Sequence, residues 1–171
     1  MTSKYIRENQ TKNGMLFILF FIFLALAFAW LSPKIKHEGQ VLVIDGDSLN
    51  VGGREIRIHG IDAPEFSQTC LRNEAIIRCG RDAMRHMAGL INGKNVICEE
   101  KDIDRYGRSV SRCFVDGEDI GAKMVLDGYA VSYGNYLQEE AEARSAKRGI
   151  WAMNFIRPDE FRRQKRLNSQ Q

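Results

Sequence analysis

The chain lacks the residue clusters on which several common classes of enzyme depend. None of its four cysteines forms a CxxC pair, and His37, His59 and His86 are scattered, so the sequence does not indicate a zinc site. It contains no catalytic serine motif, no glycine-rich phosphate-binding loop and no internal repeat. The net charge of +3 is too small to identify a nucleic-acid-binding protein by charge alone.

One uncharged, mostly apolar run, residues 15–32, accounts for much of the hydrophobic content. Its wholly apolar part, the 17 residues 15–31, would span roughly 25 Å as a helix, slightly less than a bilayer core of about 30 Å. Three basic residues precede the run, which favours a cytoplasmic N-terminus and an exported remainder. The run is either a transmembrane anchor or a signal peptide, because small-x-small cleavage sites occur at 25–27 and 27–29.

The sequence divides into five segments. These are a cytoplasmic n-region (1–14), the apolar anchor or signal segment (15–32), a charged linker (33–38), a folded domain (39–153) and a basic C-terminal tail (154–171). The tail either binds polyanions or lipid headgroups, or is a solvated helical or frayed end.

Five short strands and three helices are expected within the folded domain. The strands are predicted at 40–44, 49–51, 54–59, 95–100 and 109–115, the helices at 81–92, 120–127 and 137–148, and a loop at 66–80. Gly52-Gly53 is the strongest hairpin signal. This pattern predicts an α+β fold, and five strands with an interposed helix suit a small closed barrel of the OB type.

The four cysteines fit two disulfides. If Asp104–Arg108 is the turn of a hairpin, Cys98 lies directly opposite Cys113, within the distance that a disulfide requires. Cys70 and Cys79 would then close a small loop. The alternative is four reduced, buried thiols in a cytosolic protein, which the N-terminal segment disfavours.

Three acidic residues lie at turns where a hydrolytic site can form. Asp47 and Asp62 each follow a predicted strand, and two carboxylates with carbonyls and waters suit a hard cation such as Ca²⁺. An EF-hand is excluded, because Leu49 occupies a ligand position and Asn50 stands where that loop needs glycine. Glu65 is near enough to orient a water and act as its general base. Taken singly, each acid is an ordinary turn or loop residue.

Two arginines and several tyrosines complete the candidate site. Arg57 and Arg108 are suited to bidentate phosphate contact, although each alone would be read as a surface salt bridge. Tyr106, Tyr133 and Tyr136 either stack on nucleobases or pack within the fold. Three acids and two arginines together indicate cleavage of a phosphodiester with a bound divalent cation.

The segments VIDGDSLNV, REIRIHGIDAPE, DRYGR and AKRGIW, taken together, resemble the thermonuclease (staphylococcal nuclease) family over roughly residues 39–151. The resemblance implies a five-stranded OB-fold barrel with three helices. It also implies Ca²⁺-dependent endonucleolytic hydrolysis of DNA and RNA to 3′-phosphate products. Single-stranded or frayed regions would be preferred, and no obligate protein partner is evident.

By motif position the resemblance also implies a role for each site residue. It implies Asp47, Asp62 and the carbonyl of Ala63 as calcium ligands, Glu65 as general base, Arg57 and Arg108 as phosphate clamps, Arg105 and Tyr106 at the terminal phosphate, and Tyr133 or Tyr136 beside the base. Alanine at 63 and arginine at 105 depart from the threonine and lysine of the best-known member.

Two other functions compete with an exported nuclease. One is a catalytically inactive OB-fold module that binds nucleic acid or protein. Such a module would be expected to lose one of the acids or arginines, whereas this chain keeps all five. The other is a membrane anchor or assembly factor whose barrel only scaffolds a partner. The expected location is outside the cytoplasm, either membrane-anchored through 15–32 or secreted after cleavage.

Overall fold

The structure, a computed structural model, describes residues 15–26 and 35–170. The chain separates into two units, with the boundary between Lys34 and Ile35. In the first unit, residues 15–26 are helical. Within the described parts of the chain, no helix has the length and apolar character needed to cross a membrane. Residues 27–32 of the predicted anchor or signal segment lie outside the described residues, as does the n-region 1–14.

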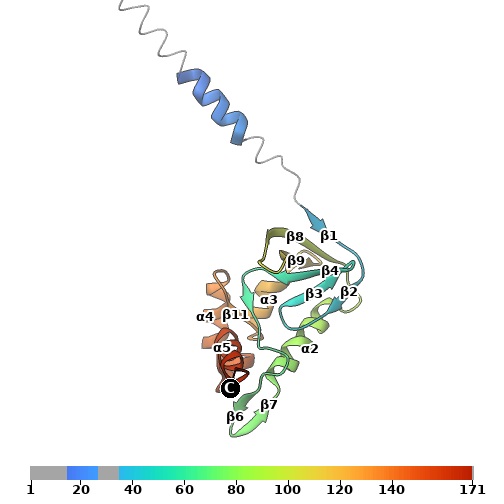
Figure 1. The fold of residues 1–171 in the computed structure, drawn as a ribbon, viewed down its shortest axis with the longest axis vertical. Helices are drawn as coiled ribbons and strands as arrows, with labels where there is room; N and C mark the ends of the chain where they lie inside the picture. Colours follow the sequence, from blue (N-terminus) through green and yellow to red (C-terminus); the bar gives the residue numbers. More distant parts are fainter. Residues whose placement is uncertain (1–14, 27–34, 171) are drawn as a thin grey trace, which may run out of the picture. The chain divides into compact units, whose positions relative to one another are not determined.

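Five neighbouring strands make up most of the seven-stranded main sheet of the second unit (Figure 1). They are β2 (Val41–Val43), β3 (Ser48–Val51), β4 (Arg54–Ile58), β8 (Val96–Ile103) and β9 (Ser109–Val115). All neighbouring pairs are antiparallel except β4 and β9, which are parallel. The five strands match those predicted, and the predicted Gly52-Gly53 hairpin joins β3 to β4.

The N-terminal segment of this unit connects the two edges of the sheet. The strand order is β1-β8-β9-β4-β3-β2, and β1 (Lys36–His37) is separated from β2 only by residues 38–40. One short stretch of chain therefore pairs with β8 at one end and with β3 at the other, which closes the sheet as in an OB-type barrel. Residues 36–37 thus form a strand where the sequence predicted part of a linker.

Of three further short pairings, one extends this sheet and two form separate two-stranded sheets. The strand β10 (Glu118–Asp119) pairs with β9, and β5 (Ile61–Asp62) pairs with β11 (Val131–Ser132). The strands β6 (Cys70–Arg72) and β7 (Ala75–Ile77) form a hairpin where the sequence predicted a loop. The turn of this hairpin places Asn73 and Glu74 at positive φ, a geometry usually signalled by glycine. Because this turn contains no glycine, its sequence does not predict a hairpin.

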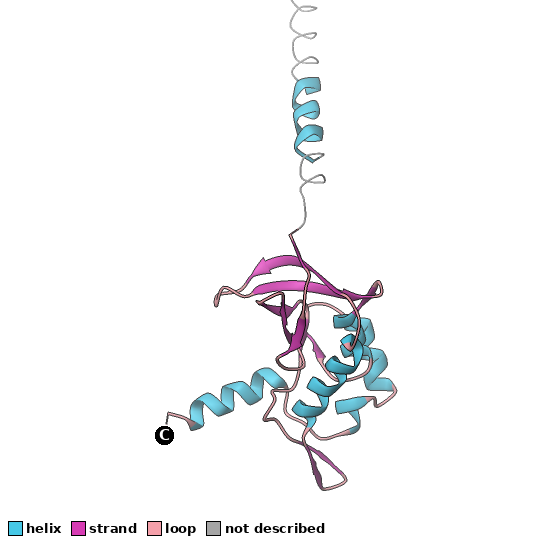
Figure 2. Cartoon of the chain, turned by 90° about the vertical axis from the view of Figure 1, so that its right-hand side faces the viewer, coloured by secondary structure: helices cyan, strands magenta, loops and turns pink. Residues whose placement is uncertain are grey.

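The three predicted helices are present, and a fourth follows them (Figure 2). They are α2 (Cys79–Ile91), α3 (Ile120–Leu126) and α4 (Leu137–Ser145), followed by a short 3₁₀ helix, η1 (Gly149–Ala152), and α5 (Pro158–Asn168). α5 covers most of the predicted tail and belongs to the same compact unit as the barrel. Proline at its first position suits a helix start, because the missing N–H would have no partner there.

The core lies inside the barrel and beneath the helices. On β4, Ile56 and Ile58 are buried while Arg57 between them points to the other face, as the strand period predicts. The predicted disulfides are both present. Cys98 and Cys113 are paired directly across β8 and β9, with their Cα atoms 4.0 Å apart. The second disulfide, Cys70–Cys79, joins β6 to the start of α2.

Glu140 connects α4 to the small sheet that carries Asp62. Its carboxylate is nearly buried and accepts hydrogen bonds from the backbone N–H of Ser132 and from the Arg144 guanidinium. Burial acts to raise the pKa of Glu140, but these donors outweigh it and hold the pKa below the ordinary value of 4.5. The ionised form is therefore the one that the fold stabilises.

The substitution Glu140→Gln is expected to lower the free energy of unfolding at pH 7 by about 1–3 kcal/mol, because it weakens a charge-assisted hydrogen bond in a buried position. A lowered pKa in the folded state stabilises the protein above the unfolded pKa, and this contribution is lost as the pH falls through the folded value. The difference from wild type should therefore shrink below pH 4.5. Urea unfolding at several pH values, with Glu139→Gln as control, measures this; equal stabilities at pH 7 would contradict it.

Candidate active site

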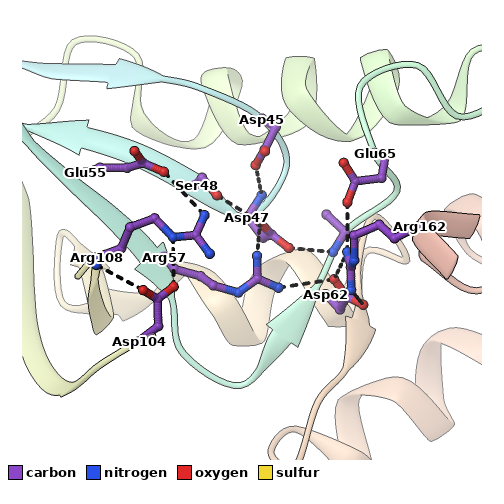
Figure 3. A network of polar contacts seen from close by, with 11 residues as sticks. Asp45, Asp47, Ser48, Glu55, Arg57, Asp62, Glu65, Asp104, Arg108 and Arg162 are labelled. Atoms are coloured by element: carbon purple, nitrogen blue, oxygen red, sulfur yellow. Dashed lines mark hydrogen bonds and ion pairs between the residues drawn. The ribbon is translucent and has the colours of Figure 1, made fainter. Parts of the chain in front are cut away.

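A cleft of about 370 Å³ brings together most of the residues singled out in the sequence. It lies on the outer side of β3 and β4, next to the segment that follows β5 (Figure 3). Its lining consists of Asp45, Asp47, Ser48, Arg57, Ala63, Pro64, Glu65, Arg105, Tyr106, Arg108, Arg162 and Arg166. Asp62 lies beside it and lines a second cleft of about 630 Å³, which shares four of the five arginines of the first cleft. The fold therefore brings turns at the ends of separate strands, with their acids and arginines, to neighbouring clefts.

Asp47 is a buried carboxylate at the floor of the cleft, just before β3. Its Oδ1 accepts hydrogen bonds from the Ser48 hydroxyl at 3.0 Å and from Arg57 Nη1 at 3.1 Å, and its Oδ2 accepts one from the Ala63 N–H at 3.0 Å. Burial raises the pKa of the Asp47 carboxyl to about 7, with the nearby carboxylates of Asp45 and Asp62 acting in the same direction and Arg57 opposing them. The site therefore favours an additional positive charge.

Asp62 is held beside Asp47 by the pairing of β5 with β11. Its side chain is 3% exposed, and its Oδ1 accepts a hydrogen bond from Arg57 Nη2 at 3.2 Å. Arg57 thus bridges the two aspartates, one through each terminal nitrogen. Asp62 is also bound by an arginine of α5: Arg162 donates from Nη1 to Oδ1 and from Nη2 to Oδ2, both at 2.8 Å.

Glu65 stands at the rim of the cleft, three residues beyond Asp62. Its Oε1 accepts a hydrogen bond from Arg162 Nη1 at 2.8 Å, and 36% of its side chain is exposed. The backbone at Glu65 packs against Gly80 in the first turn of α2, where a Cβ atom would overlap the Glu65 carbonyl oxygen. The buried side chain of Gln68 accepts from the Glu65 N–H and donates to the Ile156 carbonyl. Glycine and glutamine together fix the position of this loop.

Arg162 was not predicted as a site residue. It places a guanidinium between the carboxylates of Asp62 and Glu65 (Figure 3). The hydrogen bond to Asp62 raises its pKa, so it stays charged. In the sequence it was one of several basic residues in the tail, and nothing distinguished it from Arg163 or Arg166. Only the path of the chain brings α5 to the cleft.

Arg108 reaches the cleft from the turn between β8 and β9. Asp104 accepts from its backbone N–H at 3.0 Å and from its Nε at 2.8 Å, and Glu55 accepts from its Nη1 at 3.3 Å. Arg108 therefore forms salt bridges, the alternative to phosphate binding that the sequence left open for it. They fix the arginine while 24% of its side chain stays exposed to the cleft.

The predicted aromatic contacts divide into two groups. Tyr106 and Tyr133 are about 70% exposed and line the cleft that Asp62 shares, and the Arg105 guanidinium lies over the Tyr106 ring. Tyr136 is different, because its hydroxyl donates to Asp119 at 2.8 Å and its ring packs against the core. Burial raises the pKa of the Tyr136 hydroxyl to about 12. The structure therefore brings Tyr106 and Tyr133, but not Tyr136, to the site.

The metal-binding capacity of the site rests on two buried aspartates. In residues 15–26 and 35–170, no three or more histidine, cysteine, aspartate or glutamate side chains come together as a metal cluster. Asp47 and Asp62 offer hard oxygen ligands beside an open cleft. Ca²⁺ takes about 6–8 oxygens, so backbone carbonyls and waters would have to complete its coordination. The donor chemistry fits a hard cation that keeps several water ligands.

Comparison with known proteins gives the family. The model of the family described as "Staphylococcal nuclease homologue" matches residues 55–153, which include Arg57, Asp62, Glu65 and Arg108 and end before α5. The chain is 31% identical over 160 residues to an "Uncharacterized endonuclease" of Haemophilus influenzae, covering 85% of each chain. It is 33% identical over 134 residues to "Probable staphylococcal-like nuclease CAN1" of Oryza sativa subsp. japonica, covering 74% of this chain and 38% of the rice protein.

The printed name of a third relative does not refer to a nuclease. It is "Succinoglycan biosynthesis protein ExoI" of Rhizobium meliloti, 35% identical over 121 residues. That match covers 66% of this chain and 63% of the relative, so the chain spans less than two thirds of the Rhizobium and rice proteins but most of the Haemophilus one. Because the family model matches more than half of this chain, the chain belongs to the staphylococcal nuclease homologue family.

Proposed function

We propose that this protein is a Ca²⁺-dependent endonuclease that hydrolyses phosphodiester bonds of DNA and RNA. The observation that carries the proposal is the meeting of Arg57, Arg108 and Glu65 at one cleft beside two buried aspartates, Asp47 and Asp62. These groups are suited to three tasks: phosphate binding, proton removal from water and cation binding. Nuclease names among the relatives support the same function.

Asp47 and Asp62 would hold the cation, with the carbonyl of Ala63 as a further ligand. When bound, Ca²⁺ would polarise the phosphoryl group and offset its negative charge. The surrounding residues hold the two carboxylates in place through hydrogen bonds. Asp47 is held by the Ala63 N–H and the Ser48 hydroxyl, so it need not reorganise during the reaction.

Glu65 is the candidate general base, because it is the least buried of the three acids. It would take a proton from the water whose oxygen attacks phosphorus, while the bond from phosphorus to the 5′-oxygen breaks and that oxygen takes up a proton from solvent. Arg57 and Arg108 would donate hydrogen bonds to the phosphoryl oxygens, on which negative charge grows in the transition state. Their ion pairs with acids of the fold orient both arginines in advance. The products would carry 3′-phosphates.

The second cleft provides room for the nucleotides next to the scissile phosphate. Tyr106 and Tyr133 expose most of their rings there, and stacking on bases is a common way to bind single strands. Arg105, stacked on Tyr106, adds positive charge for the backbone. We therefore propose a preference for single-stranded or frayed DNA and RNA.

Incubation of the full-length chain with single- and double-stranded DNA and RNA in the presence of Ca²⁺ tests this function. Cleavage is expected, faster on single strands, with products whose 3′ ends are sensitive to a 3′-phosphatase. Retention of uncut nucleic acid in a gel-shift assay would contradict the proposal and favour the alternative, a catalytically inactive OB-fold module that binds nucleic acid. If the protein neither cleaves nor binds nucleic acid, the remaining explanation is a module that binds or scaffolds a protein partner.

We also propose that the second unit acts outside the cytoplasm. The support is its two disulfides, which persist in oxidising compartments, and the apolar run near the N-terminus. That run either remains as a membrane anchor or is removed with the signal peptide. N-terminal sequencing of protein from intact cells separates these two cases, and four free thiols in such protein would contradict the proposed location.

A further inference from the structure

We propose that Arg162 of α5 competes with the divalent cation for Asp62, so that the cation must displace the arginine from this carboxylate. The residue would then set the affinity of the site for the cation. This inference rests on the proposed cation site but concerns a residue beyond the stretch that the family model matches.

Arg162 binds one of the two carboxylates proposed to hold the cation, Asp62. Its two terminal nitrogens bind both carboxylate oxygens of Asp62 at 2.8 Å, and one of them also binds Glu65 Oε1 at 2.8 Å. The Asp62 side chain is 3% exposed, and it lines the second cleft together with Arg162, so the guanidinium covers the carboxylate where that cleft reaches it. A divalent cation bound to the same oxygens would meet a positive charge at contact distance. The two cannot share Asp62 in this geometry.

Charge balance explains why an arginine is there at all. Asp47 and Asp62 are both buried, and Arg57 forms an ion pair with each of them. One guanidinium for two buried carboxylates leaves a net negative charge in a poorly solvated place, which is unfavourable. Arg162 supplies the second positive charge. A bound cation would supply it equally well, which makes the arginine and the cation alternatives.

α5 is attached in a way that permits exchange. Its only buried residue is Pro158, at its first position, and the preceding Ile156 carbonyl is bound by Gln68 at 2.6 Å. Beyond that anchored start, the helix projects from the body of the unit towards the C-terminus (Figure 2). Arg162 lies one turn after Pro158, so a small rotation of α5 would withdraw it while the start of the helix stays in place. Segments with few buried contacts open at low cost.

The consequence is a cation affinity below that of the bare site. If Arg162 closes the site in about nine molecules of ten, the apparent dissociation constant rises about tenfold, because the intrinsic dissociation constant is divided by the fraction of molecules that is open. Removing the arginine should restore the intrinsic affinity. A structural role for Arg162, as a support that holds Asp62 and Glu65 ready for the cation, predicts the opposite change.

Isothermal titration of the full-length, chelator-treated protein with CaCl₂ separates these cases. Arg162→Gln is expected to bind Ca²⁺ about tenfold or more tightly than wild type. Arg162→Lys keeps the charge but has only one terminal nitrogen, so it should fall between them, and it replaces the glutamine variant if that variant fails to fold without Ca²⁺. The matched control is Arg163→Gln, since Arg163 is exposed and pairs with Glu160 on the same helix.

Unchanged or weaker binding in both Arg162 variants would overturn the inference, as would equal tightening in Arg163→Gln, which would indicate a general charge effect. Failure of every protein to bind Ca²⁺ would overturn the proposed cation site as well, which distinguishes the two failures. Hydrogen exchange gives a second readout. Added Ca²⁺ is expected to speed amide exchange in α5 of the wild-type protein, and unchanged exchange there would contradict displacement.

Discussion

Replacement of Glu65 by glutamine should lower kcat by a factor of about 10²–10⁴, the usual contribution of a positioned general base. Glutamine has nearly the same shape but cannot take a proton from the attacking water. The substitution should not weaken the binding of nucleic acid, because a carboxylate offers a phosphate no hydrogen-bond donor. The loss should therefore appear in kcat rather than in KM.

This measurement needs saturating Ca²⁺, because Glu65 also binds Arg162 and its replacement alters that contact. Single-turnover cleavage of a labelled oligonucleotide by wild type, Glu65→Gln and the exposed-site control Glu118→Gln gives the comparison. Wild-type rates in Glu65→Gln would remove Glu65 from the mechanism. A loss confined to low Ca²⁺ would instead assign it a role in cation binding.

Replacement of Arg108 by alanine should lower kcat by a factor of about 10²–10³, as expected for the loss of one preorganised donor to a developing charge. Arg108 is already oriented by Asp104 and Glu55, so little reorganisation is needed when a phosphate arrives. Both of these partners are partly exposed, so loss of their ion pairs with Arg108 should lower the free energy of unfolding only slightly.

Arg85→Ala is the matched control for Arg108→Ala, since Arg85 is highly exposed on α2 and pairs with Asp82. Thermal unfolding should show both variants close to wild type, and the cleavage assay should separate them. A rise in KM with unchanged kcat in Arg108→Ala would mean that this arginine only attracts the substrate and does not stabilise the transition state.

The candidate site could be predicted from the sequence because its residues sit in short segments with local constraints. Asp47 and Asp62 follow strands whose hydrophobic pattern is clear, and Arg57 alternates with two buried isoleucines. The Cys98–Cys113 disulfide followed from the symmetry of a hairpin around its turn. In each case the geometry depends on neighbours a few residues away or on one strand pairing.

Arg162 and Tyr136 could not be placed in this way. Arg162 binds Asp62 across 100 positions of sequence, and any of several basic residues in the tail had the same chemistry. Tyr136 adopts a left-handed backbone conformation at the start of α4 (φ 62°), and its hydroxyl binds Asp119 rather than facing the cleft. Both placements follow from how α4 and α5 pack, which composition and periodicity do not specify.

Removal of the metal tests the central claim most directly. The full-length protein should cleave a single-stranded oligonucleotide in Ca²⁺, stop when a Ca²⁺-selective chelator is added in excess, and resume when Ca²⁺ exceeds the chelator. This follows if Asp47 and Asp62 act through a bound cation. Cleavage that continues unchanged in the chelator would contradict a Ca²⁺-dependent nuclease built on these two aspartates.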